Sequence, residues 1–103
     1  MPTRHIILCT VRADVSADAV RQAFAPLAAL RGQIPGILAF SSGFGTLPHG
    51  HSQGYNYGIV MDFADAAARD AYLHDPRHAE AVAATLPVRE PESHILAFDY
   101  DYT

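Results

Sequence analysis

The order of short apolar segments and longer amphipathic ones constrains the fold more than any other feature of this chain. Four short segments rich in β-branched and aromatic residues have the pattern of strands, and they cover residues 4–12, 37–43, 55–63 and 94–102. A segment with helical spacing, residues 13–32, separates the first two, and another, residues 65–86, separates the last two. We therefore expect the order β-α-β-β-α-β in a single domain over residues 1–103.

Capping residues indicate where the helices begin. Ser16 can accept a hydrogen bond from the first turn of the first helix, and Asp65 can do the same for the second helical segment. Asp75 followed by Pro76 indicates that the second segment is split, because proline suits the first position of a new helix. Pro26 lies inside the first helix, where we expect a kink near residues 22–26.

This order of elements is that of the ferredoxin-like plait, an α+β fold in which helices cover one face of a four-stranded antiparallel sheet. The other face lacks a cover within one chain. We expect Leu38, Phe40, Val60 and Ile95 to lie partly on that face, and an uncovered apolar face indicates a partner. For Asp99, which alternates with aromatic residues in the last strand, we expect a role at the sheet edge or in a dimer contact.

Composition excludes several classes of function. The net charge is −4, lysine is absent and the seven arginines are scattered, so we expect neither nucleic acid nor a membrane surface as a partner. The longest wholly apolar runs are only a few residues long, so we expect no membrane-spanning helix and no signal peptide. Cys9 is the single cysteine and sits in an apolar run, which favours a reducing, cytoplasmic location.

Four segments, "RHIILCTVR", "GYNYGIVMDF", "AYLHDPRHAEAV" and "HILAFDYDY", together resemble the stress-responsive α/β-barrel family, also called Dabb. The resemblance covers nearly the whole chain, in order and spacing. It implies a homodimer in which two four-stranded sheets close into a barrel, which would cover the open sheet face. It is also the basis for expecting a small apolar or aromatic molecule in a cavity between the helices and the sheet.

The resemblance further implies site residues. One characterised family member cyclises a linear polyketide by an aldol-type reaction with a histidine and a tyrosine, which match His78 and Tyr72 here, and His5 lies nearby on the first strand. Tyr57 stands where a histidine is common in the family, so the polarity of the pocket cannot be carried over. Apolar residues with suitable spacing to wall the cavity, besides Tyr57, are Ile7, Cys9, Phe24, Leu27, Ile59 and Val82.

The chemistry of these side chains fits proton transfer. If Asp75 is the cap, His78 lies in the first helical turn, where the helix dipole and partial burial both favour the neutral imidazole that a general base must have. His5 could orient it, and Tyr72 could donate a hydrogen bond to a developing enolate oxygen. The alternative is that His78 is a core histidine bonded to backbone and Tyr72 an amphipathic core residue.

Metal binding is only weakly indicated. His74 and His78 have the spacing of a helical metal pair, but the break at Asp75 should turn them apart. His49 and His51 in the glycine-rich loop are a second weak signal, and no cysteine or carboxylate set completes either pair. We expect no metal and no cofactor. Four functions remain open: small-molecule binding, an aldol-type cyclase, a purely structural role linked to stress, and a monooxygenase-like or haem-binding dimeric barrel. The lack of tryptophan and of a ligand constellation disfavours the last.

Overall fold

The computed structural model describes residues 1–48 and 50–103, and its elements follow the order expected from the sequence. The strands are β1 (Thr3–Cys9), β2 (Ile37–Phe44), β3 (Tyr57–Phe63) and β4 (Leu96–Asp101). The helices are α1 (Ala17–Ala29), α2 (Ala66–His74) and α3 (Pro76–Thr85), with short 3-10 helices η1 (Leu30–Gly32) and η2 (Leu86–Val88) after α1 and α3.

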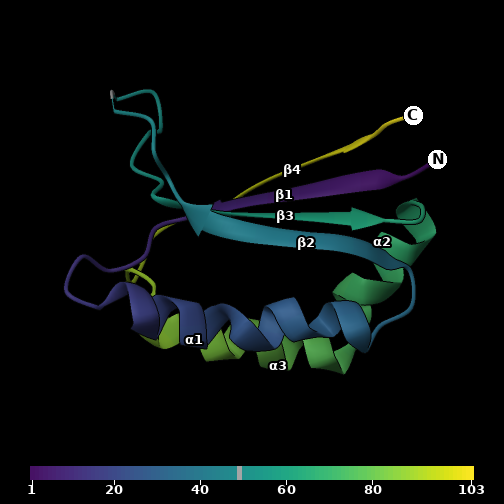
Figure 1. Cartoon of the computed structure of the whole chain (residues 1–103), viewed down its shortest axis with the longest axis horizontal. Coiled ribbons are helices and arrows are strands. Elements are labelled where there is room, and N and C mark those ends of the chain that lie inside the picture. The colour runs from purple at the N-terminus through teal and green to yellow at the C-terminus, as the bar shows by residue number, and fades with distance from the viewer. Residues whose placement is uncertain (49) are drawn as a thin grey trace.

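The strands form one antiparallel sheet in the order β2-β3-β1-β4. Strand β1 is central and pairs with β3 from Thr3 opposite Phe63 to Cys9 opposite Tyr57. Figure 1 shows α1 and α3 on one side of the sheet, with the two chain ends close together, while no helix of the described residues covers the opposite side. The predicted ferredoxin-like α+β fold is therefore confirmed.

The predicted helix caps are also confirmed. The Ser16 hydroxyl accepts a hydrogen bond from the backbone of Ala19, and the Asp65 carboxylate accepts one from Ala68. Asp75 has an extended backbone that ends α2, and its carboxylate accepts a hydrogen bond from the backbone N–H of Arg77 at 2.8 Å. The second helical segment is thus split where the sequence indicated. Helix α1 stays helical through Pro26, and the kink expected there stays a prediction.

Two strands are shorter at the loop end than the sequence suggested, and one side chain explains both. The amide of Asn56 accepts a hydrogen bond from the N–H of Val11 and donates one to the C=O of Val11. Residues 10–12 and 55–56 therefore make loop contacts, and Val11 pairs with Arg89 in an isolated bridge. β4 begins at Leu96, two residues later than expected.

The helix side of the sheet carries the core. β1 and β3 alternate, so that Cys9, Ile59, Met61 and Phe63 face the helices and are buried. From α1, the buried residues Val20, Phe24 and Leu27 pack against this side.

Two residues expected on the open face lie on the helix side. A register shift between Ile37 and Ala39 inverts the alternation of β2, so Phe40 pairs with Met61 and packs against the core. Ile95 precedes β4 and lines a cavity on the helix side, in phase with Ala97. Val60 does lie on the open face, and Leu38, in the irregular part of β2, is exposed.

The open face of the sheet is nevertheless apolar. Phe98 is 64% exposed and Leu96 and Tyr100 are also exposed. Strand β1 lies between β4 and β3, and its side chains Ile6 and Leu8 on this face are half-buried. The continuous apolar set is therefore Ile6, Leu8, Val60, Leu96, Phe98 and Tyr100. We call these six residues the open sheet face.

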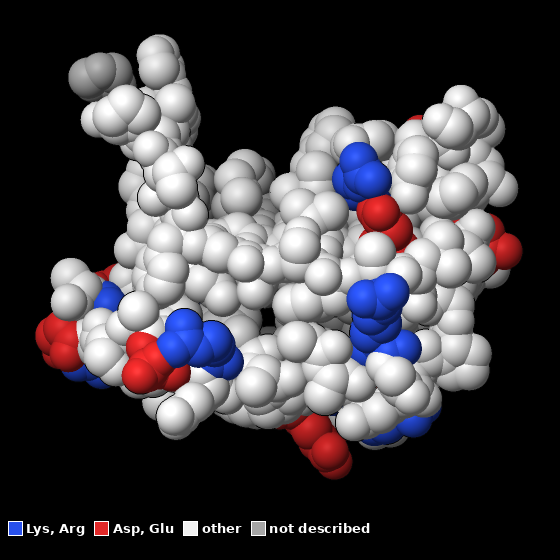
Figure 2. All heavy atoms as spheres, in the orientation of Figure 1, with Lys and Arg blue, Asp and Glu red and all other residues white. Residues whose placement is uncertain are grey.

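Charges are sparse and locally balanced. At one end of the open sheet face Arg4 makes a two-point ion pair with Asp62, at 2.8 and 3.0 Å, and its guanidinium lies 4.5 Å from the ring centre of Tyr102. On the side of the molecule shown in Figure 2, charged side chains are few and blue and red ones adjoin in several places. Among the described residues, no helix has the length and apolar character needed to cross a membrane.

Candidate functional site

A cavity of about 360 Å³ lies between the sheet and the helices. Its volume falls in the range typical of small-molecule pockets. Nine of the residues expected at the site line it: His5, Ile7, Cys9, Phe24, Leu27, Ile59, Tyr72, His78 and Val82. The fold thus brings these nine residues together around one cavity.

Helical spacing explains how α3 contributes to the cavity. Val82 lies four residues after His78, and Thr85 three residues after Val82. This spacing places all three side chains on the face of α3 that is turned toward the sheet. On the opposite side the wall is formed by Ile95 and Ala97, which are exposed, so the cavity opens toward solvent along β4.

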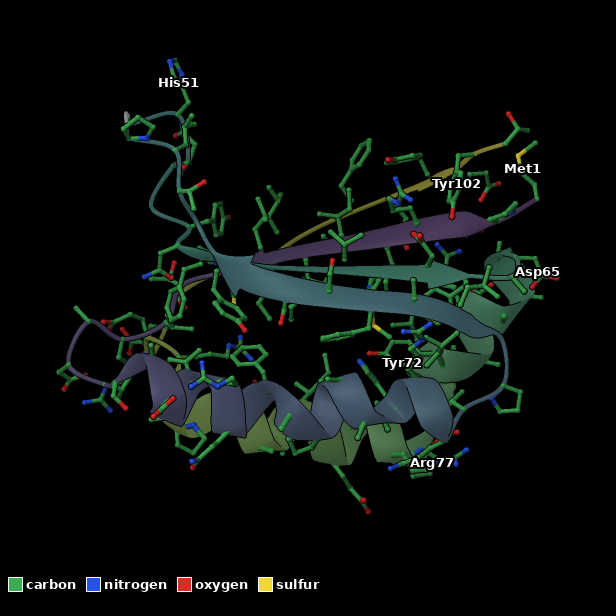
Figure 3. The ribbon with its side chains drawn as sticks, in the orientation of Figure 1. Met1, His51, Asp65, Tyr72, Arg77 and Tyr102 are labelled. Atoms are coloured by element: carbon green, nitrogen blue, oxygen red, sulfur yellow. The ribbon has the colours of Figure 1, made fainter. Side chains whose placement is uncertain are left out.

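Tyr72 lies at the polar end of the cavity. Its side chain is only 1% exposed, and Figure 3 shows it in the space between the sheet and the helices. Its ring centre lies 4.5 Å from that of His78 and 6.4 Å from that of His5. Burial raises the pKa of the phenol to about 12, so the hydroxyl is protonated at neutral pH and can donate a hydrogen bond. Within the described residues this hydroxyl makes no hydrogen bond.

His78 is half-buried and neutral at pH 7. Burial lowers the pKa of its imidazole, and the nearby His5 lowers it further. The backbone of Leu73 and the carboxylate of Asp75 act in the opposite direction but do not reverse the shift. A neutral imidazole beside a protonated phenol is an arrangement in which one group can accept a proton while the other donates a hydrogen bond.

Asp99 lies on β4, an edge strand of the sheet as the sequence suggested, and a contact across a dimer stays a prediction. Because it pairs with His5 across β1 and β4, both side chains lie on the helix side of the sheet. One Asp99 oxygen lies 2.7 Å from His5 Nδ1, and the other accepts a hydrogen bond at 2.7 Å from Nη1 of Arg69 on α2. An Nδ1–H of His5 can donate to this carboxylate, which fixes the orientation of the ring. Strand alternation could have shown that Asp99 faces the helices, since it is in phase with Ala97, but not that it pairs with His5.

Tyr57 is the one expected site residue that does not line the cavity. Its ring packs 4.6 Å from the ring of Phe24 and 5.1 Å from that of Phe44, and its hydroxyl bonds to Ser42 at 3.1 Å. The side chain is therefore held near the loop end of the sheet, away from His5 and the polar end of the cavity.

Six residues of the wall were not expected from the sequence: Met61, Leu73, Thr85, Arg89, Ile95 and Ala97. Two of them carried a usable signal, because Met61 alternates with Ile59 on one strand face and Thr85 shares a helix face with Val82. Arg89 carried none, because it reaches the cavity through the turn after α3.

The weak metal signals do not converge. His74 is exposed and its Nδ1 contacts the backbone oxygen of Asp70 at 2.8 Å, away from the cavity. His51 lies at the tip of a loop far from the sheet (Figure 3), and His49 is outside the described residues. Over residues 1–48 and 50–103, no three histidine, cysteine or acidic side chains are grouped so that they could hold a metal ion.

Solved structures with the same fold come from plants and bacteria. The Arabidopsis thaliana protein At3g17210 has a TM-score of 0.85 and 24% identity, over 98% of this chain and 95% of that one. A dimeric ferredoxin-like protein of unknown function from Jannaschia sp. has a TM-score of 0.81 and 26% identity, over 99% and 100%. A hydroxynitrile lyase from Passiflora edulis has a TM-score of 0.78 and 18% identity, over 99% and 95%.

Among curated proteins, none matches this chain. A family model, in contrast, matches residues 3–102, which is almost the whole chain. The matched region contains every element of the sheet and all three helices that enclose the cavity. The chain therefore belongs to the stress responsive A/B barrel domain family, Dabb.

Proposed function

We propose that this protein is a homodimer that binds a small apolar or aromatic molecule in the cavity between its helices and its sheet. The observation that supports this most strongly is the cavity itself, which has an apolar wall and a polar end formed by His5, Tyr72 and His78. Small-molecule sites combine these two features, since apolar surface provides affinity and a few polar groups fix the orientation.

The open sheet face supports the dimer. Six neighbouring apolar side chains are exposed or half-buried on it, and a surface of this kind is a frequent site of protein contact. The Jannaschia neighbour is described as dimeric. In the proposed dimer two such faces pack against each other and enclose a barrel between the two sheets.

Ligand binding can be tested by thermal unfolding in the presence of small aromatic compounds. A ligand at 100 times its Kd stabilises the folded state by about 2.7 kcal/mol, which in a domain of this size is a rise in Tm of roughly 10 °C or more. Val82→Phe should abolish the rise by filling the cavity. Ala83→Phe, on the exposed side of α3, should leave it intact.

If both variants respond to the compounds as the unchanged protein does, the ligand binds elsewhere and the proposal fails. It also fails if none of a broad set of aromatic compounds raises the Tm. Because Val82→Phe could itself destabilise the fold, its Tm without ligand is the reference for each comparison.

A second candidate is an enzyme that removes a proton next to a carbonyl group, as an aldol-type cyclase does. In this scheme His78 takes a proton from the carbon next to the carbonyl, and the electron pair moves to the carbonyl oxygen, where Tyr72 donates a hydrogen bond. The enolate carbon then attacks a second carbonyl carbon of the same molecule, and the new alkoxide takes up the proton. The neutral imidazole and the unpaired phenol hydroxyl favour this candidate.

Cyclisation of linear poly-β-keto thioesters by the purified protein would test the scheme. The loss of a general base typically slows catalysis by about 10²- to 10⁴-fold, so His78→Ala should do so. His74→Ala, on the exposed side of α2, is the matched control and should have little effect. Equal losses in the two variants would refute the assignment of His78.

A further inference from the structure

Arg89 stands apart from the other arginines. Five arginines, Arg4, Arg12, Arg21, Arg69 and Arg77, each pair with a carboxylate. Over residues 1–48 and 50–103, Arg31 and Arg89 have no such ion pair, and Arg31 is exposed to solvent. Arg89 is half-buried, and its Nε is buried without a hydrogen-bond partner in the described part of the chain.

The backbone holds Arg89 in place at the cavity. Its N–H donates to the oxygen of Leu86 at 3.2 Å, and it forms an isolated bridge with Val11. The neighbouring Arg12 N–H donates to Val88 at 2.8 Å, which ties the same turn to the start of the chain. The position of Arg89 is therefore set by the fold before any ligand arrives.

The charge of Arg89 reaches into the cavity, which Arg89 lines together with Cys9 and Thr85. Burial raises the pKa of the Cys9 thiol, and the guanidinium of Arg89 partly opposes that rise. A cation thus acts on a cavity wall whose other members are mostly apolar. Arg89 also lines a second, surface hollow together with Glu90 and Glu92.

We propose that the ligand is an apolar or aromatic carboxylic acid whose carboxylate binds Arg89, while its apolar body fills the cavity toward Tyr72 and His78. This inference rests on the proposed ligand-binding function. A guanidinium matches a carboxylate with two parallel N–H donors, and such charge-assisted bonds are stronger than neutral ones.

The test is a comparison of matched acids and amides by isothermal titration calorimetry at pH 7. The probes are benzoate and 2-naphthoate with benzamide and 2-naphthamide, which have nearly the same shape but no charge. We expect each acid that binds to bind about 10- to 100-fold more tightly than its amide. Arg89→Met, which keeps the apolar stem, should remove this preference and leave the affinity for the amides unchanged. Arg31→Met is the control and should retain the preference.

The outcomes separate this inference from the function on which it rests. If the amides bind as tightly as the acids, the cavity is a binding site and the role of Arg89 is refuted. The same holds if Arg89→Met weakens acid and amide equally, because the residue would then act only by shaping the cavity. If neither acids nor amides bind, the proposed ligand-binding function and this inference both fail.

Discussion

Replacing Phe98 with alanine should dissociate the proposed dimer. Phe98 is 64% exposed on β4, between Leu96 and Tyr100 of the open sheet face, so the dimer would bury most of what is now exposed. A phenylalanine side chain buries about 150–250 Å² when fully enclosed, so removing the ring takes roughly 100 Å² of apolar surface from each copy. At about 25 cal/mol per Å² this is about 2.5 kcal/mol per copy. In a two-fold dimer the loss counts twice, about 5 kcal/mol, which raises the dimer Kd by between 10³- and 10⁴-fold.

Sedimentation velocity over a range of protein concentrations measures this shift. The unchanged protein should sediment as a dimer at micromolar concentration, and Phe98→Ala as a monomer. Leu86→Ala is the control, because Leu86 is 57% exposed but lies in η2, away from the sheet. If Phe98→Ala stays dimeric at concentrations where the unchanged protein is dimeric, or if Leu86→Ala dissociates it equally, the open sheet face is not the dimer interface.

Three further predictions concern stability. Gly36→Ala should lower the free energy of unfolding by about 1–3 kcal/mol. Gly36 has a φ of +92°, and an added Cβ would lie 2.7 Å from the Cβ of Ala68. Gly32→Ala is the control, because an added Cβ there meets open space and should cause no such loss. Pro26→Ala should raise the free energy of unfolding by up to about 3 kcal/mol, because it restores a backbone donor inside α1. Folding lowers the pKa of the His78 imidazole, so below pH 6.5 the unfolded chain binds more protons than the folded chain. The free energy of unfolding should therefore fall as the pH drops below that value. In His78→Gln this fall should be less steep.

Urea unfolding followed by circular dichroism measures all three effects. Equal stabilities for the two glycine variants would contradict the close approach at residue 36. A loss of stability on removing Pro26 would mean that the proline is accommodated by contacts of its own. A pH dependence that is unchanged in His78→Gln would assign the titration to another group.

The fold could be predicted because each of its elements is encoded locally. The caps at Ser16, Asp65 and Asp75 depend on residues adjacent in sequence, and strand alternation placed β1 and β3 correctly. The register shift in β2 could not be predicted in this way, since it depends on pairing with β3. That is why Phe40 was assigned to the wrong face of the sheet.

The site was predictable only in part, for a related reason. The apolar wall and the set of His5, Tyr72 and His78 came from periodicity and from the family resemblance. The partnership of Asp99 with His5 joins residues 94 positions apart, and Arg69 joins it from a helix. Arg89 depends on a turn whose path the sequence does not specify. Long-range polar contacts were therefore the part of the site that local patterns could not supply.

The central claim is that a small molecule binds in the cavity between helices and sheet, and methyl chemical shifts test it most directly. Titration of isotopically labelled protein with the tightest-binding aromatic compound should shift the methyl signals of Leu27, Ile59 and Val82, which line the cavity. The signals of Leu96 and Ile6, on the open sheet face, should stay in place. Shifts confined to the open sheet face, with the cavity signals unmoved, would contradict the account.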